Sequence, residues 1–226
     1  MIDDAIDAIK NNKMVLLFDS ADREGETDFV IPAISTTPQD VALMRRDGGG
    51  LICVAIHPDA CERLGLPFIS DVLCDGGFSG ITEKNGDIRY DRRSSFSLWV
   101  NHRDTFTGIP DNDRAYTIRE MGKLVKKSMA GEDVNFADGF RTPGHVALLR
   151  GAAGLIEDRQ GQTELSIVMA EMAGVTPAMV VCEMLDEKSG NALTKDDAIA
   201  YGKKHGLVFV TGAQVVDAYT KWKKTI

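Results

Sequence analysis

The sequence contains little cysteine and no long apolar run. Its four cysteines, Cys53, Cys61, Cys74 and Cys182, form no CxxC pair, so their spacing fits neither a zinc site nor a dense disulfide framework. No apolar stretch approaches the roughly 20 residues that a membrane-spanning helix needs. The first residues show neither the basic nor the apolar region of a secretory signal peptide. We therefore expect a protein of the reducing cytoplasm.

Positive charge is also scarce relative to negative charge. The 226 residues include 26 Lys and Arg against 34 Asp and Glu, which gives a net charge of -8. An acidic chain is repelled by nucleic-acid backbones and anionic membranes, so neither is expected as a partner. The hydrophobic fraction of 43% and the charged fraction of 27% are ordinary for a globular protein that buries a core.

The acidic segment Asp19–Asp28 lies between two apolar, strand-like runs and carries five carboxylates and one arginine. If the segment is extended, Glu24, Glu26 and Asp28 point to one face, because side chains alternate along a strand. Three oxygen ligands on one face suit magnesium or manganese, and a cation would relieve the repulsion between carboxylates beside core strands. A solvated acidic turn is the alternative interpretation.

Helical and strand-like patterns alternate along the whole chain, with no internal repeat and no linker that would divide it. This pattern predicts one α/β (α+β) domain over residues 1–226, in which helices flank a mixed, twisted sheet in three layers. The pattern Thr117-x-x-Glu120 resembles a capping box and predicts a helix start. Helices are expected over 2–10, 37–48, 117–129, 162–173 and 194–206, after Pro58 and from 213, and strands over 14–18, 51–56, 95–100, 146–149, 178–185 and 207–210.

Residues 75–93 differ in composition from the rest of the chain. They are rich in glycine and other turn residues and contain little material for a core. Loops of this length often cover active sites, so we expect a mobile active-site loop. A disordered excursion is the alternative.

Three further segments carry chemically useful side chains. In the segment 140–146, Arg141 and Thr142 could hold a phosphate, Gly144 would permit close approach to a ligand, and His145 could bind a metal or transfer protons. A plain turn is the alternative. Glu164 falls in the first turn of an expected helix, where the helix dipole favours an acid for structural reasons alone. Residues 106–114 form either a capped turn or a phosphate-facing loop.

Together and in this order, these segments resemble the 3,4-dihydroxy-2-butanone 4-phosphate synthase family of riboflavin biosynthesis. The resemblance runs from about residue 3 to the C-terminus, and the extra loop is similar to that of the archaeal members. Because no domain resembling a GTP cyclohydrolase follows, the stand-alone form is expected. The motifs that carry the resemblance are Asp22–Asp28 (DREGETD), Gly50–Cys53 (GLIC), Thr107–Arg114, Pro143–His145 (PGH) and Gly161–Glu164 (GQTE).

The resemblance implies a lyase that converts D-ribulose 5-phosphate to 3,4-dihydroxy-2-butanone 4-phosphate and formate. It implies two magnesium ions per site, with manganese as a substitute, held by Glu24 and His145. Asp28 and Glu164 are implied for proton transfer, and Arg119 is a further catalytic candidate. A cytoplasmic homodimer is implied as well.

The resemblance also implies which residues bind substrate. Two positions depart from the common family pattern. Gln162 stands where many relatives have histidine, which leaves its side chain without an assigned role. Thr142 stands where bacterial and plant relatives often have arginine, so Arg141 or Arg23 is expected to take more of the phosphate. The implied substrate-binding residues are Arg23, Glu24, Asp28, Thr107, Arg141, Thr142, Pro143, Gly144, His145, Val146 and Glu164.

Functions of other classes stay open on residue chemistry alone. One is another metal-dependent sugar-phosphate lyase or isomerase. A nucleotide- or RNA-binding module of related fold would need a basic groove, which the acidic composition disfavours. A non-catalytic, metal-bound structural protein is disfavoured because every acidic and histidine position of the implied site is present.

Overall fold

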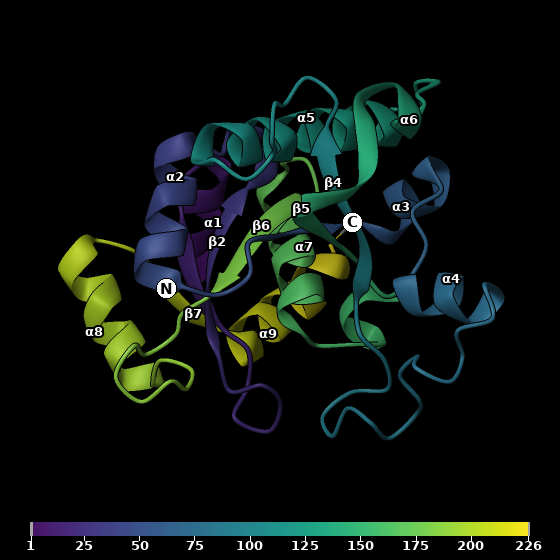
Figure 1. Ribbon diagram of the computed structural model, residues 1–226. Helices are drawn as coiled ribbons and strands as arrows, with labels where there is room; N and C mark the ends of the chain where they lie inside the picture. The colour runs from purple at the N-terminus through teal and green to yellow at the C-terminus, as the bar shows by residue number, and fades with distance from the viewer. Residues whose placement is uncertain (1, 226) are drawn as a thin grey trace.

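The computed structural model describes residues 2–225 and is built around one seven-stranded sheet (Figure 1). The strand order is β4-β5-β3-β6-β2-β1-β7. Strands β3 and β5 run parallel, as do β1 and β7, whereas the other neighbouring pairs are antiparallel. The predicted mixed sheet is therefore confirmed. The strands are β1 (Val15–Phe18), β2 (Thr27–Pro32), β3 (Cys53–Ile56), β4 (Phe96–His102), β5 (Phe140–Arg150), β6 (Ala178–Glu183) and β7 (Phe209–Thr211).

Helices cover both faces of the sheet, which confirms the predicted three layers (Figure 1). One hydrophobic cluster joins the sheet to α2, α3 and α5, and a second joins it to α1, α7 and α9. None of the helices described for residues 2–225 has both the length and the apolar character needed to cross a bilayer. The helices are α1 (Ile2–Lys10), α2 (Pro38–Leu43), α3 (Pro58–Leu64), α4 (Ile69–Asp75), α5 (Asp111–Met129), α6 (Phe136–Gly139), α7 (Gln162–Ala173), α8 (Lys195–His205) and α9 (Gly212–Lys223).

Helix α7 lies almost wholly inside the protein. Ten of its 12 residues are buried, including the polar residues of its first turn, Gln162, Thr163 and Glu164. A helix that is buried on all sides cannot be recognised by an apolar stripe. Its first turn reaches the end of the sheet where the acidic segment begins, and this position brings polar side chains to the site.

The expected helix start at Thr117 is wrong. Helix α5 already begins at Asp111, after Pro110, and Thr117 lies in its interior. The hydroxyl of Thr117 is buried and accepts a hydrogen bond from the backbone N–H of His102 (3.0 Å). The Thr117 hydroxyl therefore binds the backbone of strand β4 and does not cap a helix, although the local sequence matches a capping pattern.

The alternative interpretation of residues 143–145 as a plain turn is wrong, because β5 runs through them. The Thr142–Pro143 peptide bond is cis, and β5 pairs with β4 on both sides of this irregular stretch. A Cβ on Gly144 would overlap the backbone of Val100 in β4. Glycine is therefore required at this position by the close approach of two strands.

Candidate active site

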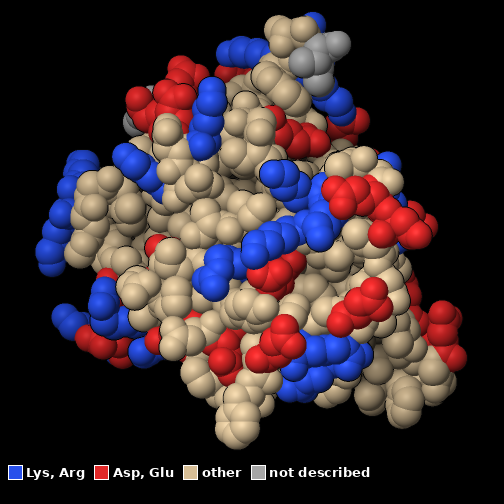
Figure 2. Space-filling view, turned by 90° about the horizontal axis from the view of Figure 1, so that it is seen from above, with Lys and Arg blue, Asp and Glu red and all other residues tan. Residues whose placement is uncertain are grey.

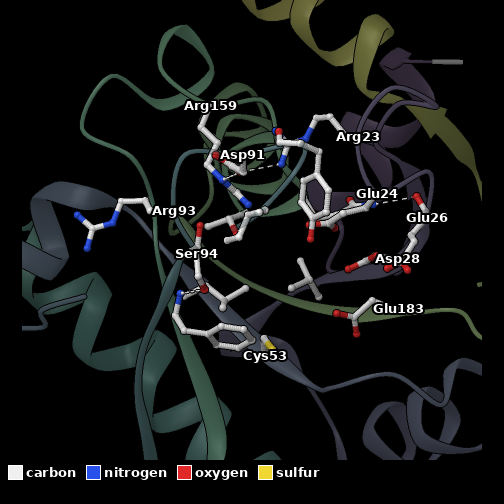
Figure 3. Close-up of a pocket in the computed structure, with 18 of the residues that line it drawn as sticks. Arg23, Glu24, Glu26, Asp28, Cys53, Asp91, Arg93, Ser94, Arg159 and Glu183 are labelled. Carbon is white, nitrogen blue, oxygen red and sulfur yellow. Dashed lines mark hydrogen bonds and ion pairs between the residues drawn. The ribbon is translucent and has the colours of Figure 1, made fainter. Parts of the chain in front are cut away.

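A pocket with a volume of about 590 Å³ lies at one end of the sheet (Figure 3). Its walls come from the loop between β1 and β2, the ends of β2, β3 and β6, the first turn of α7, and residues 83–95. Carboxylates gather on one side of the pocket, whereas Arg93 and Arg159 lie toward the other side. The four carboxylates that line the pocket on that side are Glu24, Glu26, Asp28 and Glu183.

Two of these carboxylates are placed opposite each other by strand pairing. Strands β2 and β6 are antiparallel, and Asp28 pairs directly with Glu183. Like charges on directly paired residues destabilise a sheet. Burial, followed by the charge of Glu183, raises the pKa of Asp28 well above its usual value. Among the described residues, Asp28 Oδ1 has no hydrogen-bond partner, so the pocket holds a buried acceptor that is not satisfied by protein.

The pKa values of the other carboxylates in the cluster are also raised by this pocket. Burial raises the pKa of Glu24, and burial together with the charge of Glu24 raises the pKa of Glu26 to about 7. Burial likewise raises the pKa of Glu183. Evolution rarely leaves such a cluster without a counter-charge, because each ionised member raises the cost of ionising the next.

The cluster fits a hard divalent cation. Carboxylate oxygens are the ligands that magnesium and manganese prefer, and a cation would remove the repulsion described above. Within residues 2–225, no group of three or more His, Cys, Asp or Glu side chains is already arranged to enclose a metal ion. Such an open arrangement suits magnesium, which commonly keeps several waters and takes only one or two protein carboxylates.

The acidic segment is a folded loop and not an extended strand before residue 27. Asp19 accepts hydrogen bonds from the backbone N–H groups of Glu24 and Glu26 (both 3.1 Å), and Gly25 adopts a left-handed φ of 69°. Residues 21–24 form a turn. The side chains of Glu24, Glu26 and Asp28 nevertheless line the same pocket, although the folded loop and not strand alternation brings Glu24 there.

The side chain of Gln162 holds this loop in place through two hydrogen bonds. Its Nε2 donates to the backbone carbonyl oxygens of Leu17 (3.0 Å) and Glu26 (3.1 Å), which lie at the two ends of the acidic loop. The side chain is buried. Gln162 therefore has a structural role, since it supplies the donor that holds the two ends of the loop.

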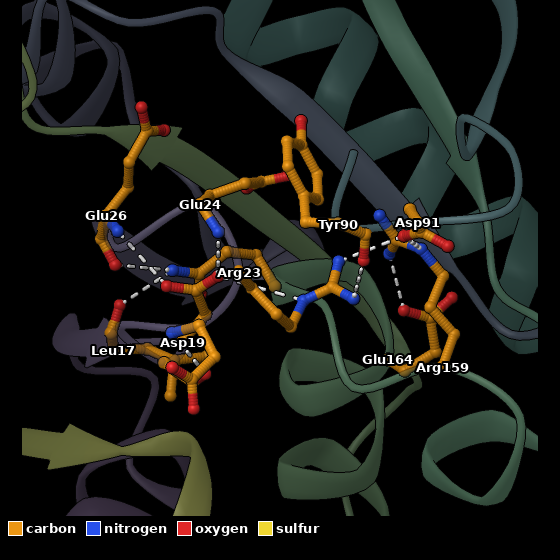
Figure 4. A network of polar contacts seen from close by, with 12 residues as sticks. Leu17, Asp19, Arg23, Glu24, Glu26, Tyr90, Asp91, Arg159 and Glu164 are labelled. Atoms are coloured by element: carbon orange, nitrogen blue, oxygen red, sulfur yellow. Dashed lines mark hydrogen bonds and ion pairs between the residues drawn. The ribbon is translucent and has the colours of Figure 1, made fainter. Parts of the chain in front are cut away.

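A chain of alternating charges crosses the pocket (Figure 4). Asp91 accepts from Arg23 Nη2 (3.0 Å) and from Arg159 Nε (2.5 Å), and Arg159 Nη1 donates to Glu164 Oε2 (2.6 Å). The other Glu164 oxygen accepts from the backbone N–H of Ala152 (3.0 Å). Burial raises the pKa of Glu164, although Arg159 opposes this effect. Burial also acts to raise the pKa of Asp91, but Arg159 and Arg23 hold that pKa below its usual value.

The pocket brings together Arg23, Glu24, Glu26 and Asp28, which were singled out from the sequence. Glu164 lies behind Arg159 and is fully buried. The sequence reasoning missed Glu183, Asp91 and Arg159. The sequence does contain a sign that Glu183 is functional, because it is an acid at the end of an otherwise apolar strand. It contains no such sign for Asp91, since the contacts of Asp91 depend on where a long loop docks.

His145 does not line this pocket within one chain. It is exposed on β5, and its backbone N–H donates to Asn101 Oδ1 (2.8 Å). Ala147, two residues after His145, pairs with Cys53 of β3. Cys53 also pairs with Val181 of β6, which lies two residues before Glu183. The register therefore places His145 at the same end of the sheet as Glu183, about two strand spacings (~10 Å) away.

The remaining predicted residues lie outside the pocket. Thr142 Oγ1 donates to the Trp99 carbonyl (2.8 Å), and the Thr107 carbonyl accepts from Asn101 Nδ2 (3.2 Å). Arg119 Nη1 donates to the Thr36 carbonyl (3.1 Å), on the face of the sheet covered by α5. Strand β5 carries the others near its start: Arg141 and Pro143 are exposed, Gly144 is half-buried, and Val146 is buried.

The chain is similar to known proteins over almost its whole length. Residues 3–218 match the family model of 3,4-dihydroxy-2-butanone 4-phosphate synthase. The enzyme of that name from Methanosarcina mazei is 55% identical over 229 residues, which cover 99% of this chain and 93% of the relative. The Archaeoglobus fulgidus enzyme is 52% identical over 227 residues, which cover 98% of this chain and 95% of the relative.

Solved structures agree with these relatives. A crystal structure of 3,4-dihydroxy-2-butanone 4-phosphate synthase in complex with two magnesium ions has a TM-score of 0.80 and 28% identity, covering 99% of this chain and 97% of that chain. The enzyme from Candida albicans has a TM-score of 0.75 and 28% identity, with 96% of each chain covered. The fold is thus that of one family of enzymes.

Proposed function

The chain belongs to the 3,4-dihydroxy-2-butanone 4-phosphate synthase family, and on that premise we propose that its acidic pocket is the active site. The protein is a lyase of riboflavin biosynthesis that converts D-ribulose 5-phosphate to 3,4-dihydroxy-2-butanone 4-phosphate and formate. The observation that supports the site is the cluster of Glu24, Glu26, Asp28 and Glu183, which lines one cavity with Asp28 buried, the other three half-buried, and all four pKa values raised.

Magnesium is the cofactor, in line with the family structure that contains two magnesium ions. We assign Glu24 as its carboxylate ligand in the pocket and His145 as the second protein ligand, with manganese as a substitute. When bound, magnesium supplies Lewis-acid stabilisation of the oxyanions that form on the sugar phosphate. Waters and substrate oxygens would complete the coordination, since the described side chains form no closed metal cage.

Asp28 and Glu164 are assigned to proton transfer. Both are buried, and burial raises the pKa of each carboxyl group. A carboxylate with a raised pKa is a stronger proton acceptor than an ordinary one, and the enolisation of a ketose requires a proton acceptor. Arg159 holds Glu164 in a fixed orientation through a 2.6 Å ion pair.

The phosphate group is assigned to Arg141 and Thr142. Arg23 is already paired with Asp91, whereas Arg141 is exposed and makes no ion pair among residues 2–225. Of the two cations expected to compensate for Thr142, Arg141 is therefore the better candidate. A free guanidinium beside a hydroxyl can bind a phosphate through charge-assisted hydrogen bonds.

We further propose a homodimer that covers the exposed start of β5. Nearby, in the loop after β4, Phe106 has 95% of its surface exposed and Ile109 has 50%. Large apolar side chains that protrude in this way mark contact surfaces. The loop is tied to β5 because Asn101 contacts both Thr107 and His145. A second copy on this face would place Arg141, Thr142 and His145 at the interface.

We also propose that the enzyme works in the cytoplasm without nucleic-acid or membrane partners. The net charge of -8 disfavours both kinds of partner. On the face shown in Figure 2, acidic side chains flank the basic ones.

The deciding experiment measures formate release from ribulose 5-phosphate with magnesium and with EDTA, and identifies the carbon skeleton of the product. We expect metal-dependent formate together with a four-carbon ketone phosphate. Consumption of substrate without formate would point to an isomerase or another lyase. No reaction with folded protein would favour a binding module.

A further inference from the structure

Residues 76–95, here called the lid, connect α4 to β4 without forming a helix or strand. The lid is held to the body of the protein at two places. At its outer end, the Arg93 guanidinium bonds Asp71 and Ser70 of α4 (both 2.8 Å). At its inner end, Tyr90 and Asp91 enter the pocket. The lid residues before them, 83–88, bond mainly to one another and to Ser94.

The inner contact depends on one carboxylate oxygen. Asp91 Oδ2 accepts from both Arg23 and Arg159, so two guanidinium groups converge on it (Figure 4). All three side chains are largely buried, with 10%, 14% and 13% of the surface of Asp91, Arg23 and Arg159 exposed. Arg23 also lies 5.6 Å from the centre of the Tyr90 ring and contacts the Tyr90 carbonyl (3.4 Å). Charge-assisted hydrogen bonds in a buried setting are the strongest contacts available to the lid.

Asp91 reaches beyond the lid through Arg159. The same guanidinium that binds Asp91 through Nε binds Glu164 through Nη1. If the lid lifts, Arg159 loses one of its two carboxylate partners and can turn with Glu164 as its remaining partner. The position of the lid and the orientation of Glu164 are therefore connected by one side chain.

We propose that Asp91 is a positioning residue that couples closure of the lid to the alignment of Glu164 through Arg159. The coupling to catalysis rests on the proposed function, in which Glu164 transfers protons. Because Tyr90 and Asp91 line the cavity, lifting of the lid would widen the path by which substrate enters. Closure then restores the Asp91–Arg159–Glu164 alignment and excludes water from the reacting carbons.

The first test is limited trypsin digestion, which needs no activity. Lys84, Arg89 and Arg92 are exposed cleavage sites in the lid. Asp91→Asn keeps the shape of the side chain but removes its charge, so we expect cleavage in the lid to become about tenfold faster. Asp91→Glu should restore protection in part. The control is Asp75→Asn, an exposed carboxylate at the end of α4 that makes no ion pair among residues 2–225.

The second test separates kcat from KM for formate release. We expect Asp91→Asn to lower kcat by 10- to 100-fold, in the range of a lost orienting contact, with a smaller change in KM. Asp91→Glu should recover part of kcat, and Asp75→Asn should match the wild type. Melting temperatures of all variants, measured in parallel, show whether each is folded.

The two tests together distinguish the proposed coupling from a contact that only holds the lid. Faster lid cleavage with an unchanged kcat would overturn the coupling and leave Asp91 as a lid anchor only. Unchanged cleavage in Asp91→Asn would overturn the lid contact itself. If the wild-type enzyme releases no formate, the proposed function fails and the coupling fails with it, whereas digestion still decides whether Asp91 holds the lid.

Discussion

The side chain of Glu183 lies directly against the Cα atom of Gly50. A Cβ on Gly50 would overlap the Glu183 carboxylate, and the next backbone N–H, that of Leu51, donates to Glu183 Oε2 (2.8 Å). Gly50 also donates its own N–H to the Glu183 carbonyl (3.1 Å). The absence of a side chain at Gly50 therefore leaves the space that Glu183, an acid of the proposed active site, occupies.

Replacing Gly50 with alanine should displace Glu183 and lower activity more than stability. We expect kcat/KM to fall at least tenfold, while the strain of the inserted methyl group costs about 1–3 kcal/mol of unfolding free energy. Steady-state kinetics and chemical denaturation measure the two effects. Gly80→Ala is the control, because a Cβ there meets no atom within 4 Å. Normal kinetics in Gly50→Ala would show that the position of Glu183 does not matter to the reaction.

Removing the charge of Glu183 should stabilise the metal-free protein. Asp28 and Glu183 repel each other across the β2–β6 pair, so Glu183→Gln is expected to raise the melting temperature in EDTA by about 2–4 °C, or about 1 kcal/mol. The amide oxygen of glutamine can still accept from Leu51. The same variant should lose activity in magnesium. Glu187→Gln, an exposed acid beyond β6, is the control, and an equal shift in both variants would contradict the repulsion argument.

Magnesium should raise the melting temperature of the wild-type protein. Saturation at about 100 times the dissociation constant contributes about 2.7 kcal/mol, which corresponds to roughly 5–10 °C for a chain of this size. Glu24→Gln or His145→Ala should remove most of this shift and abolish turnover while the fold survives. Glu132→Gln, an exposed acid in the loop after α5, serves as the control. Near-normal activity in either site variant would disprove the metal assignment.

Asp47 should contribute stability that is lost in acid. Its hydrogen bond with Arg46 and a further one from Tyr201 lower its pKa to about 2, against an unfolded value of 3.8. A carboxylate with a depressed folded pKa stabilises the protein above pH 3.8, and this stabilisation disappears as the pH falls to about 2. The melting temperature of Asp47→Asn should therefore lie below that of the wild type at pH 5 and converge with it near pH 2. A constant difference across this range would contradict the assignment.

Helix ends show how far local sequence reasoning reaches. A capping box of Thr37 and Asp40 begins α2 where the sequence predicts a helix start, and Gly174 and Gly206 end α7 and α8 with left-handed φ values. These features depend on residues within four positions of one another. The pattern at Thr117 failed because its hydroxyl bonds His102, on a strand that precedes the helix.

The same distinction holds for the candidate site. The sequence by itself determined the three-layer class, the acidic segment that carries Glu24, Glu26 and Asp28, and the family, because the hydrophobic pattern and the order of motifs can be read along the chain. Only the tertiary structure decided that Glu183 faces Asp28 and that Asp91 joins Arg23 to Arg159. Those contacts arise from strand pairing and loop docking between segments up to about 150 residues apart, and no local pattern specifies which distant segment will supply the partner.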